Sequence, residues 1–235
     1  MIYIEKNEGE NIPKGSDGAL AMYGAIESGI NYKLVTFNTI NGFKNDFFMG
    51  NIFIGTIDFM NLVFNKLKTT PRVPYNSNRK SELSTIEEII NRVSESGQIF
   101  IKPYNNIKLF TGLVVDKFCI NFLCKFPLST KVLTYPVINN IRSEWRLYIS
   151  QGKIVGSKNY LGDFEISPDY DFARAIIEEN SIMLPETYTM DIGITDTENF
   201  VVEFNDMWAI GNYGIDNELY LRLLKRRYVE IIKNI

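Results

Sequence analysis

The chain has 235 residues, of which 45% are hydrophobic, enough for a dense core in one large or two small domains. Its formal net charge of −3 argues against strong non-specific binding to nucleic acids, but not against a local basic cleft. The sequence contains no histidine, which excludes Ser-His-Asp and Cys-His catalysis and most transition-metal sites. Any chemistry must therefore use carboxylates, lysine, arginine and a hard metal ion.

Residues 1 to about 70 alternate short apolar runs with helix-like segments. The runs predict strands at 2–4, 32–37 and 51–54, and helices at 18–28 and 56–67. This βαβ rhythm indicates a small, largely parallel sheet. The first residues are no secretory signal, and the sequence has no apolar run near 18 residues, so we expect a cytoplasmic protein that does not span a membrane.

The segment 71–81, PRVPYNSNRKS, reads as a linker because it is polar and rich in turn residues. A helix is expected to follow it. Ser84 is the expected N-cap, and Glu87, three residues later, is the expected acid of a capping box. The helix should run to about Ser96 and stop at Gly97.

A lysine lies in a strand-like run at 98–115, QIFIKPYNNIKLFTGLVV. Lys102 follows the apolar residues 99–101, and a polar loop leads to a second apolar run at 113–115. A strand lysine supplies a point charge and a polar loop supplies N–H and hydroxyl donors, which together suit nucleotide phosphates. The alternative is a surface hairpin with ordinary solvated lysines.

Two further runs follow, at 131–138 and 143–160. The first ends in Pro136 and suits an edge or hinge between two sheets. In the second, Glu144, Arg146 and Tyr148 alternate with apolar residues, which predicts a strand, and a turn at 151–153 begins a return strand. The structural alternative for this strand is an ion pair between Glu144 and Arg146, which would be worth little on a surface.

The most informative segment is 188–205, YTMDIGITDTENFVVEFN, which reads as a β-hairpin. Glu203 and Asn205 are two apart in the second strand, so their side chains leave the same face. If the strands pair across the turn, Asp191 on the first strand faces the same side. Three hard oxygen ligands would then share one sheet face, a natural site for Mg²⁺ carrying phosphates.

A basic amphipathic helix is expected at 215–235, bearing Lys225, Arg226 and Arg227. It reads as a packing helix with a solvated basic face. The alternative is a contact for an anionic substrate.

The four segments 98–115, 131–138, 143–160 and 188–205 occur in an order that resembles the ATP-grasp superfamily. The spacing of Lys108, Thr111 and Gly112 is similar to that of a compact branch found in phages and bacteria. The resemblance implies an α/β fold in which two α+β lobes, residues 71–135 and 136–235, clasp ATP. It also implies a small βαβ substrate domain, residues 1–70, in front of them.

The resemblance implies roles for individual residues. By the family pattern Lys102 and Arg146 contact the phosphates, and Lys158 matches a second basic residue of the site. The loop over the phosphates would contain Lys108, Thr111 and Gly112. Adenine would bind backbone groups near Val137 and Ile138, and Mg²⁺ would bind Asp191, Glu203 and Asn205.

The reaction implied is that of an ATP-dependent carboxylate–amine ligase. The γ-phosphate of ATP activates a carboxylate as an acyl phosphate, which an amine or similar nucleophile then attacks. Two alternatives remain open: a phosphotransferase or nucleic-acid end-modifying enzyme with the same ATP site, and a non-catalytic nucleotide-binding module. The acceptor, whether a small molecule, a peptide or a nucleic-acid end, and the oligomeric state are not encoded in any motif we recognise.

Overall fold

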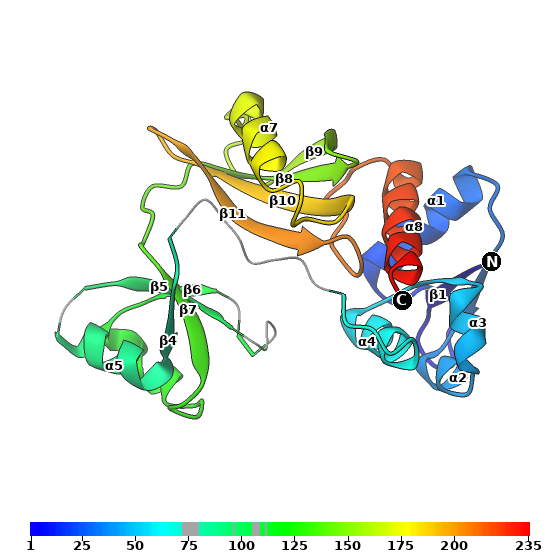
Figure 1. The fold of residues 1–235 in the computed structure, drawn as a ribbon, viewed down its shortest axis with the longest axis horizontal. Coiled ribbons are helices and arrows are strands. Elements are labelled where there is room, and N and C mark those ends of the chain that lie inside the picture. Colours follow the sequence, from blue (N-terminus) through cyan, green and yellow to red (C-terminus); the bar gives the residue numbers. More distant parts are fainter. Residues whose placement is uncertain (72–79, 96, 105–108, 111) are drawn as a thin grey trace. The chain divides into compact units, whose positions relative to one another are not determined.

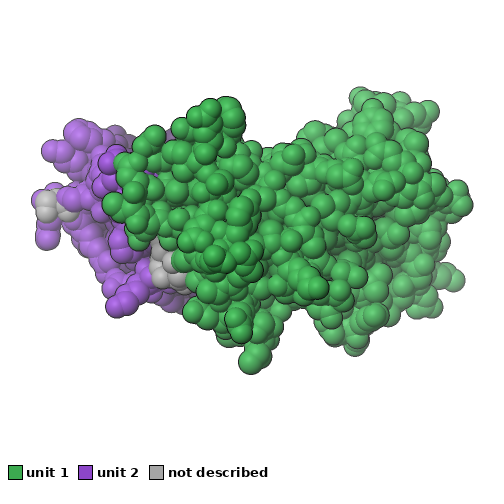
Figure 2. Space-filling view, turned by 90° about the horizontal axis from the view of Figure 1, so that it is seen from above, with its two compact units in different colours: residues 1–76, 142–235 green, residues 77–141 purple. Residues whose placement is uncertain are grey.

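The computed structural model describes residues 1–71, 80–95, 97–104, 109–110 and 112–235 (Figure 1). The chain forms two compact units, coloured separately in Figure 2: residues 1–76 with 142–235, and residues 77–141. Within the described ranges, no helix has both the length and the apolar character needed to cross a membrane.

The first unit contains a three-stranded parallel sheet near the N-terminus. Its central strand is β1 (Ile2–Glu5), with β2 (Tyr32–Val35) on one side and β3 (Ile52–Ile54) on the other. Helix α1 (Gly15–Glu27) connects β1 to β2, and α4 (Ile57–Lys66) follows β3. The predicted βαβ arrangement is confirmed.

The predicted strand at 32–37 is two residues too long. The hydroxyl of Thr36 accepts a hydrogen bond from the Thr39 N–H (3.2 Å) and so caps a helix that the sequence did not predict, α2 (Phe37–Asn41). A second short helix, α3 (Asn45–Met49), follows it before β3. A local cap therefore wins over the apolar pattern at Phe37.

The same unit contains a four-stranded antiparallel sheet in the order β11-β10-β8-β9. The strands are β8 (Ser143–Ser150), β9 (Lys153–Gly162), β10 (Thr187–Ile194) and β11 (Asn199–Asp206). Both predicted hairpins are confirmed. Helix α7 (Tyr170–Glu179), which was not predicted, covers one face of this sheet (Figure 1). The core beneath it includes Leu147, Ile149, Met190, Ile192, Ala173, Ile176 and Ile177.

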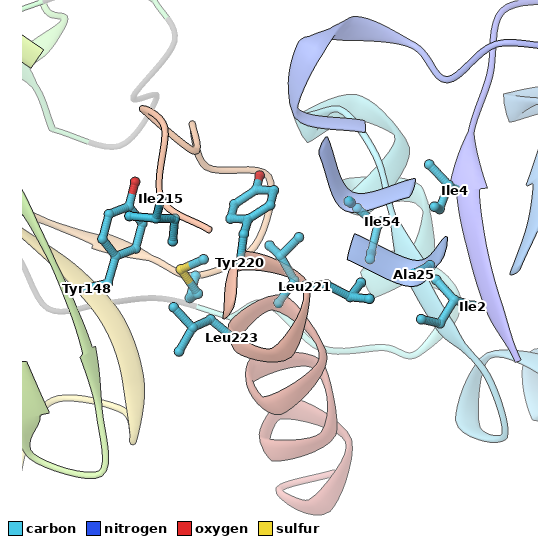
Figure 3. Packing of buried hydrophobic residues seen from close by; sticks show 12 residues of the cluster. Ile2, Ile4, Ala25, Ile54, Tyr148, Ile215, Tyr220, Leu221 and Leu223 are labelled. Atoms are coloured by element: carbon cyan, nitrogen blue, oxygen red, sulfur yellow. The ribbon is translucent and has the colours of Figure 1, made fainter. Parts of the chain in front are cut away.

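Helix α8 (Asn217–Lys233) joins the two sheets of this unit into one core. Figure 3 shows its buried face, with Tyr220, Leu221 and Leu223, between side chains of β1 and β3 and those of the larger sheet. The packing role predicted for this helix is confirmed. Residues 1–76 and 142–235 therefore share hydrophobic packing, while the domain boundary at residue 70 stays a prediction.

The second unit is an antiparallel sheet in the order β4-β7-β5-β6 with helices beside it. Its strands are β4 (Glu82–Thr85), β5 (Ile99–Pro103), β6 (Leu113–Val115) and β7 (Lys131–Tyr135). Helix α5 (Ile86–Glu95) contributes Ile86, Ile89 and Val93 to its core. A 3-10 turn (Lys117–Cys119) and α6 (Ile120–Leu123) follow β6.

The predicted cap of helix α5 is wrong by one residue. Ser84 lies in strand β4, opposite Val132. The capping box is formed by Thr85 and Glu88: the Glu88 N–H donates to the Thr85 hydroxyl (3.3 Å), and the Thr85 N–H donates to the Glu88 carboxylate (3.0 Å). Pairing of β4 with β7 holds Ser84 extended, so the cap moves to the next residue.

Candidate functional site

Four charged residues form a row across one face of the larger sheet. Glu203 on β11 is opposite Asp191 on β10, which is opposite Arg146 on β8, which is opposite Lys158 on β9. Directly opposed residues of antiparallel strands share a face and lie about 4.5–5.5 Å apart at Cα. The structure thus brings together, in one register row, residues that the sequence analysis assigned from two separate segments.

The centre of this row is a buried ion pair. Arg146 Nε donates to Asp191 Oδ1 (2.8 Å), and Arg146 Nη2 donates to Asp191 Oδ2 (2.7 Å). The two side chains are 5% and 2% exposed. The structural alternative, a surface pair of Arg146 with Glu144, is wrong: Glu144 accepts a hydrogen bond from the Tyr160 hydroxyl, and the partner of Arg146 is Asp191.

The three predicted metal ligands converge on the same side of the β10–β11 hairpin. The Asn205 amide nitrogen donates to Glu203 Oε1 (3.1 Å) and lies 3.4 Å from Asp191 Oδ2. Their oxygen-only donor set is the kind that Mg²⁺ prefers, so the residues present fit that ion. Among the described residues, no group of three or more His, Cys, Asp or Glu side chains is arranged to hold a metal, so a three-ligand set at this hairpin needs the amide oxygen of Asn205.

Burial and charge act in opposite directions on the central pair. Burial raises the pKa of Asp191 to about 6, against the hydrogen bonds and charge of Arg146, while Glu203 and Glu144 add to the rise. For Arg146, burial lowers the pKa, but Asp191 outweighs it and leaves the pKa above its ordinary value. Arg146 therefore keeps a positive charge, and Asp191 is mostly ionised at neutral pH.

A loop between β11 and α8 closes over the row and was not singled out in the sequence. The backbone carbonyl of Gly211 accepts from Arg146 Nη1 (3.4 Å) and from the Tyr148 hydroxyl (3.1 Å). The Tyr213 ring lies over the Arg146 guanidinium, 4.5 Å from its central carbon. Only tertiary contacts bring this loop to β8, so no local pattern announced it.

In the second unit, Lys102 lies on β5 as predicted, with Gly112 directly beside it. A Cβ added at Gly112 would lie 2.8 Å from Lys102 Cγ and 2.9 Å from the Phe100 ring, so glycine permits the close approach. Lys102 is half-buried and its ammonium lies 5.7 Å from the centroid of the Phe100 ring. Lys108 and Thr111 lie outside the described residues.

The predicted hinge residues follow β7 in the second unit. Val137 and Ile138 are half-buried and lie outside any strand or helix. The assignment of adenine binding to their backbone groups stays a prediction.

Several solved structures share this architecture across nearly the whole chain. The ATP-grasp ligase PsnB, complexed with a phosphomimetic variant of its minimal precursor, Mg and ADP, matches with a TM-score of 0.58 at 10% identity, covering 97% of each chain. A RimK domain ATP-grasp protein from Sphaerobacter thermophilus matches with a TM-score of 0.57 at 12% identity, covering 99% and 98%. D-alanine–D-alanine ligase from Bacillus anthracis, complexed with ATP, matches with a TM-score of 0.55 at 11% identity, covering 99% and 98%. These likenesses define the fold as ATP-grasp.

The sequence narrows this class further. Residues 77–223, more than half of the chain, match the model of an ATP-grasp domain family, the second family of its clade. The protein therefore belongs to that ATP-grasp family. No curated protein matches its sequence.

Proposed function

We propose that this protein is a Mg²⁺- and ATP-dependent ligase that activates a carboxylate as an acyl phosphate and joins it to an amine or similar nucleophile. The observation that carries the proposal is the convergence of Asp191, Glu203 and Asn205 on one face of a hairpin, beside Arg146. Family membership supports it, since ATP-grasp proteins are mostly ATP-dependent ligases.

The larger sheet would supply the metal end of the site. Asp191, Glu203 and Asn205 would hold Mg²⁺, which when bound neutralises phosphate charge. Two of the guanidinium nitrogens of Arg146 donate to Asp191, so we assign Arg146 two roles, because it both holds that carboxylate in place and puts positive charge beside it. Lys158, the next residue of the row, would add a second positive charge toward the phosphates.

The smaller unit would supply the other contacts to ATP. Lys102 would meet the phosphates as a point charge, and the loop containing Lys108, Thr111 and Gly112 would cover them. Backbone groups near Val137 and Ile138 would bind adenine. The first 70 residues, as a small parallel sheet, would form the substrate domain.

The reaction would depend on positioning and charge neutralisation more than on a general base. The described groups of the row are carboxylates, an amide, a guanidinium and an ammonium. Such groups hold reactants in line and offset the charge that develops during phosphoryl transfer. An incoming amine would lose its proton to phosphate or water. The acceptor would be a small molecule, a peptide or a nucleic-acid end.

Product analysis tests this proposal. The purified protein is incubated with Mg²⁺, labelled ATP and pooled carboxylates and amines, and with RNA and peptide acceptors in parallel. A ligase releases ADP and phosphate only when both substrates are present. ADP with a phosphorylated acceptor would identify a phosphotransferase, and AMP with a lysyl-AMP adduct a nucleotidyl-transfer ligase. If ATP neither binds nor turns over under any condition, the protein is not this enzyme.

A further inference from the structure

Tyr213 covers the guanidinium of Arg146 from the solvent side. Its ring centroid is 4.5 Å from the central guanidinium carbon, and the ring stacks on Tyr160 at 5.0 Å with an interplanar angle of 18°. The Tyr160 ring is itself 5.9 Å from the same carbon. Two aromatic rings therefore lie next to the guanidinium whose nitrogens donate to Asp191, an arrangement that favours a cation.

The backbone around Tyr213 is held in an unfavourable conformation. Tyr213 has φ +49°, in the left-handed region that a bulky residue rarely adopts. The loop is pinned at two points: the Asn212 N–H donates to Asp17 on α1 (3.0 Å), and the Asn212 carbonyl accepts from the Tyr148 hydroxyl. Strain of this kind persists only where the surroundings over-determine it, and it is common at functional sites.

Exposure separates Tyr213 from an ordinary core residue. Its side chain is 48% exposed, yet the Arg146 beneath it is almost completely buried. The ring thus keeps water from the guanidinium while giving little apolar area to the core. A residue with this placement affects the site below it more than the stability of the fold.

We propose that Tyr213 is a positioning residue that holds the Arg146 fork in its two-point contact with Asp191, and thereby sets the position of the Asp191 carboxylate for Mg²⁺. The link to Mg²⁺ rests on the proposed function, whereas the link to Arg146 rests on the geometry alone. The ring is what matters, since the contact with Arg146 is made by its face. Phenylalanine should therefore replace tyrosine and leucine should not.

The test compares Tyr213→Leu and Tyr213→Phe with a matched control, Tyr23→Leu. Tyr23 lies on α1 and is 50% exposed, so the control removes a ring of similar exposure away from the row. The first readout is the Nε–H resonance of Arg146 in ¹⁵N-labelled protein without nucleotide, assigned by its loss in Arg146→Lys. The second is the Mg²⁺ concentration that gives half-maximal ATP binding, with the melting temperature recorded for each variant.

In the wild type the Nε–H proton should show a ring-current shift and slow exchange with water. Tyr213→Leu should remove the shift, speed the exchange and raise the half-maximal Mg²⁺ concentration roughly 2- to 30-fold, which is a cation–π energy of about 0.5–2 kcal/mol at 1.4 kcal/mol per tenfold. Tyr213→Phe and Tyr23→Leu should behave as the wild type in both readouts.

An Arg146 resonance that is the same in Tyr213→Leu as in the wild type would overturn the positioning role. So would a Tyr213→Phe variant as impaired as Tyr213→Leu. If the wild type does not bind ATP with Mg²⁺, the proposed function fails, and the resonance still decides whether Tyr213 positions Arg146.

Discussion

The buried pair of Arg146 and Asp191 should dominate the stability of the larger sheet. Replacing Arg146 with methionine keeps the stem and removes the charge, which leaves a carboxylate that is 2% exposed without its partner. Breaking a buried pair by removal of one partner costs about 3–5 kcal/mol, because the remaining charge stays desolvated. We expect Arg146→Met to lose a free energy of unfolding in this range.

The same sheet offers a matched control. Arg142 and Asp196 form an ion pair of the same chemistry, but the side chains are 47% and 62% exposed. An exposed pair of this kind contributes less than about 1 kcal/mol. Arg142→Met should therefore change the free energy of unfolding by a small fraction of what Arg146→Met does.

Urea unfolding followed by tryptophan fluorescence measures both effects, and an unchanged m-value shows that the transition is comparable. Combining Arg146→Met with Asp191→Asn closes a double-mutant cycle. The double variant should recover much of the loss, since the uncompensated carboxylate is gone. If Arg146→Met lost no more stability than Arg142→Met, the assignment of a buried pair between Arg146 and Asp191 would be wrong.

Three other outcomes follow from the structure. Arg227→Met should lose about 3–5 kcal/mol of unfolding free energy, because the guanidinium pairs with the carboxylate at the end of β11 at 2.6 and 2.7 Å; Arg222→Met, exposed on the same helix, is the control in the same urea titration. Gly24→Ala should lose about 1–3 kcal/mol, since its Cβ would lie 2.2 Å from the first carbonyl oxygen of α8, whereas Gly50→Ala, with open space around it, should show a melting temperature near the wild-type value. Burial raises the pKa of Asp191 to about 6, so protonation below that pH should compete with Mg²⁺; ATP binding at pH 5.5 should need more Mg²⁺ than at pH 7.5, and equal requirements would contradict the metal assignment.

The paired strands of the site were predictable because their signals are local. Apolar and polar residues alternate along 143–150, and turn residues separate the two runs of 188–205. Period-two geometry then placed Glu203 and Asn205 on one face, and the register of the hairpin added Asp191. These inferences needed only the pleat of a strand and a short connection.

The partner of Arg146 was not predictable in the same way. Asp191 is 45 residues away in the chain, and the sheet order places β10 rather than β9 at the side where the two carboxylate oxygens lie. The sequence suggested instead the nearby Glu144, which bonds Tyr160. Pairings between distant strands depend on the whole sheet, so a single strand pattern does not specify them.

The loop bearing Tyr213 shows a second limit. Its residues carry turn signals, but nothing in them indicates that the Tyr213 ring will cover a guanidinium on β8. The cap of α5 shows a smaller one: either Ser84 or Thr85 can serve as an N-cap by residue type, and strand pairing selects Thr85. In both cases tertiary contacts choose among locally acceptable conformations.

Binding of ATP in the presence of Mg²⁺ tests the central claim most directly. Isothermal titration with a non-hydrolysable ATP analogue is run with Mg²⁺ and with EDTA, on the wild type, on Glu203→Gln and on Glu198→Gln. Glu198 is exposed in the turn of the same hairpin, so its amide variant makes the same charge change away from the row. The wild type and Glu198→Gln should bind the analogue with Mg²⁺ and lose affinity in EDTA, and Glu203→Gln should have the weak, Mg²⁺-independent affinity of the EDTA sample at an unchanged melting temperature. Equal, Mg²⁺-dependent affinity in all three proteins would contradict a metal site at Asp191, Glu203 and Asn205.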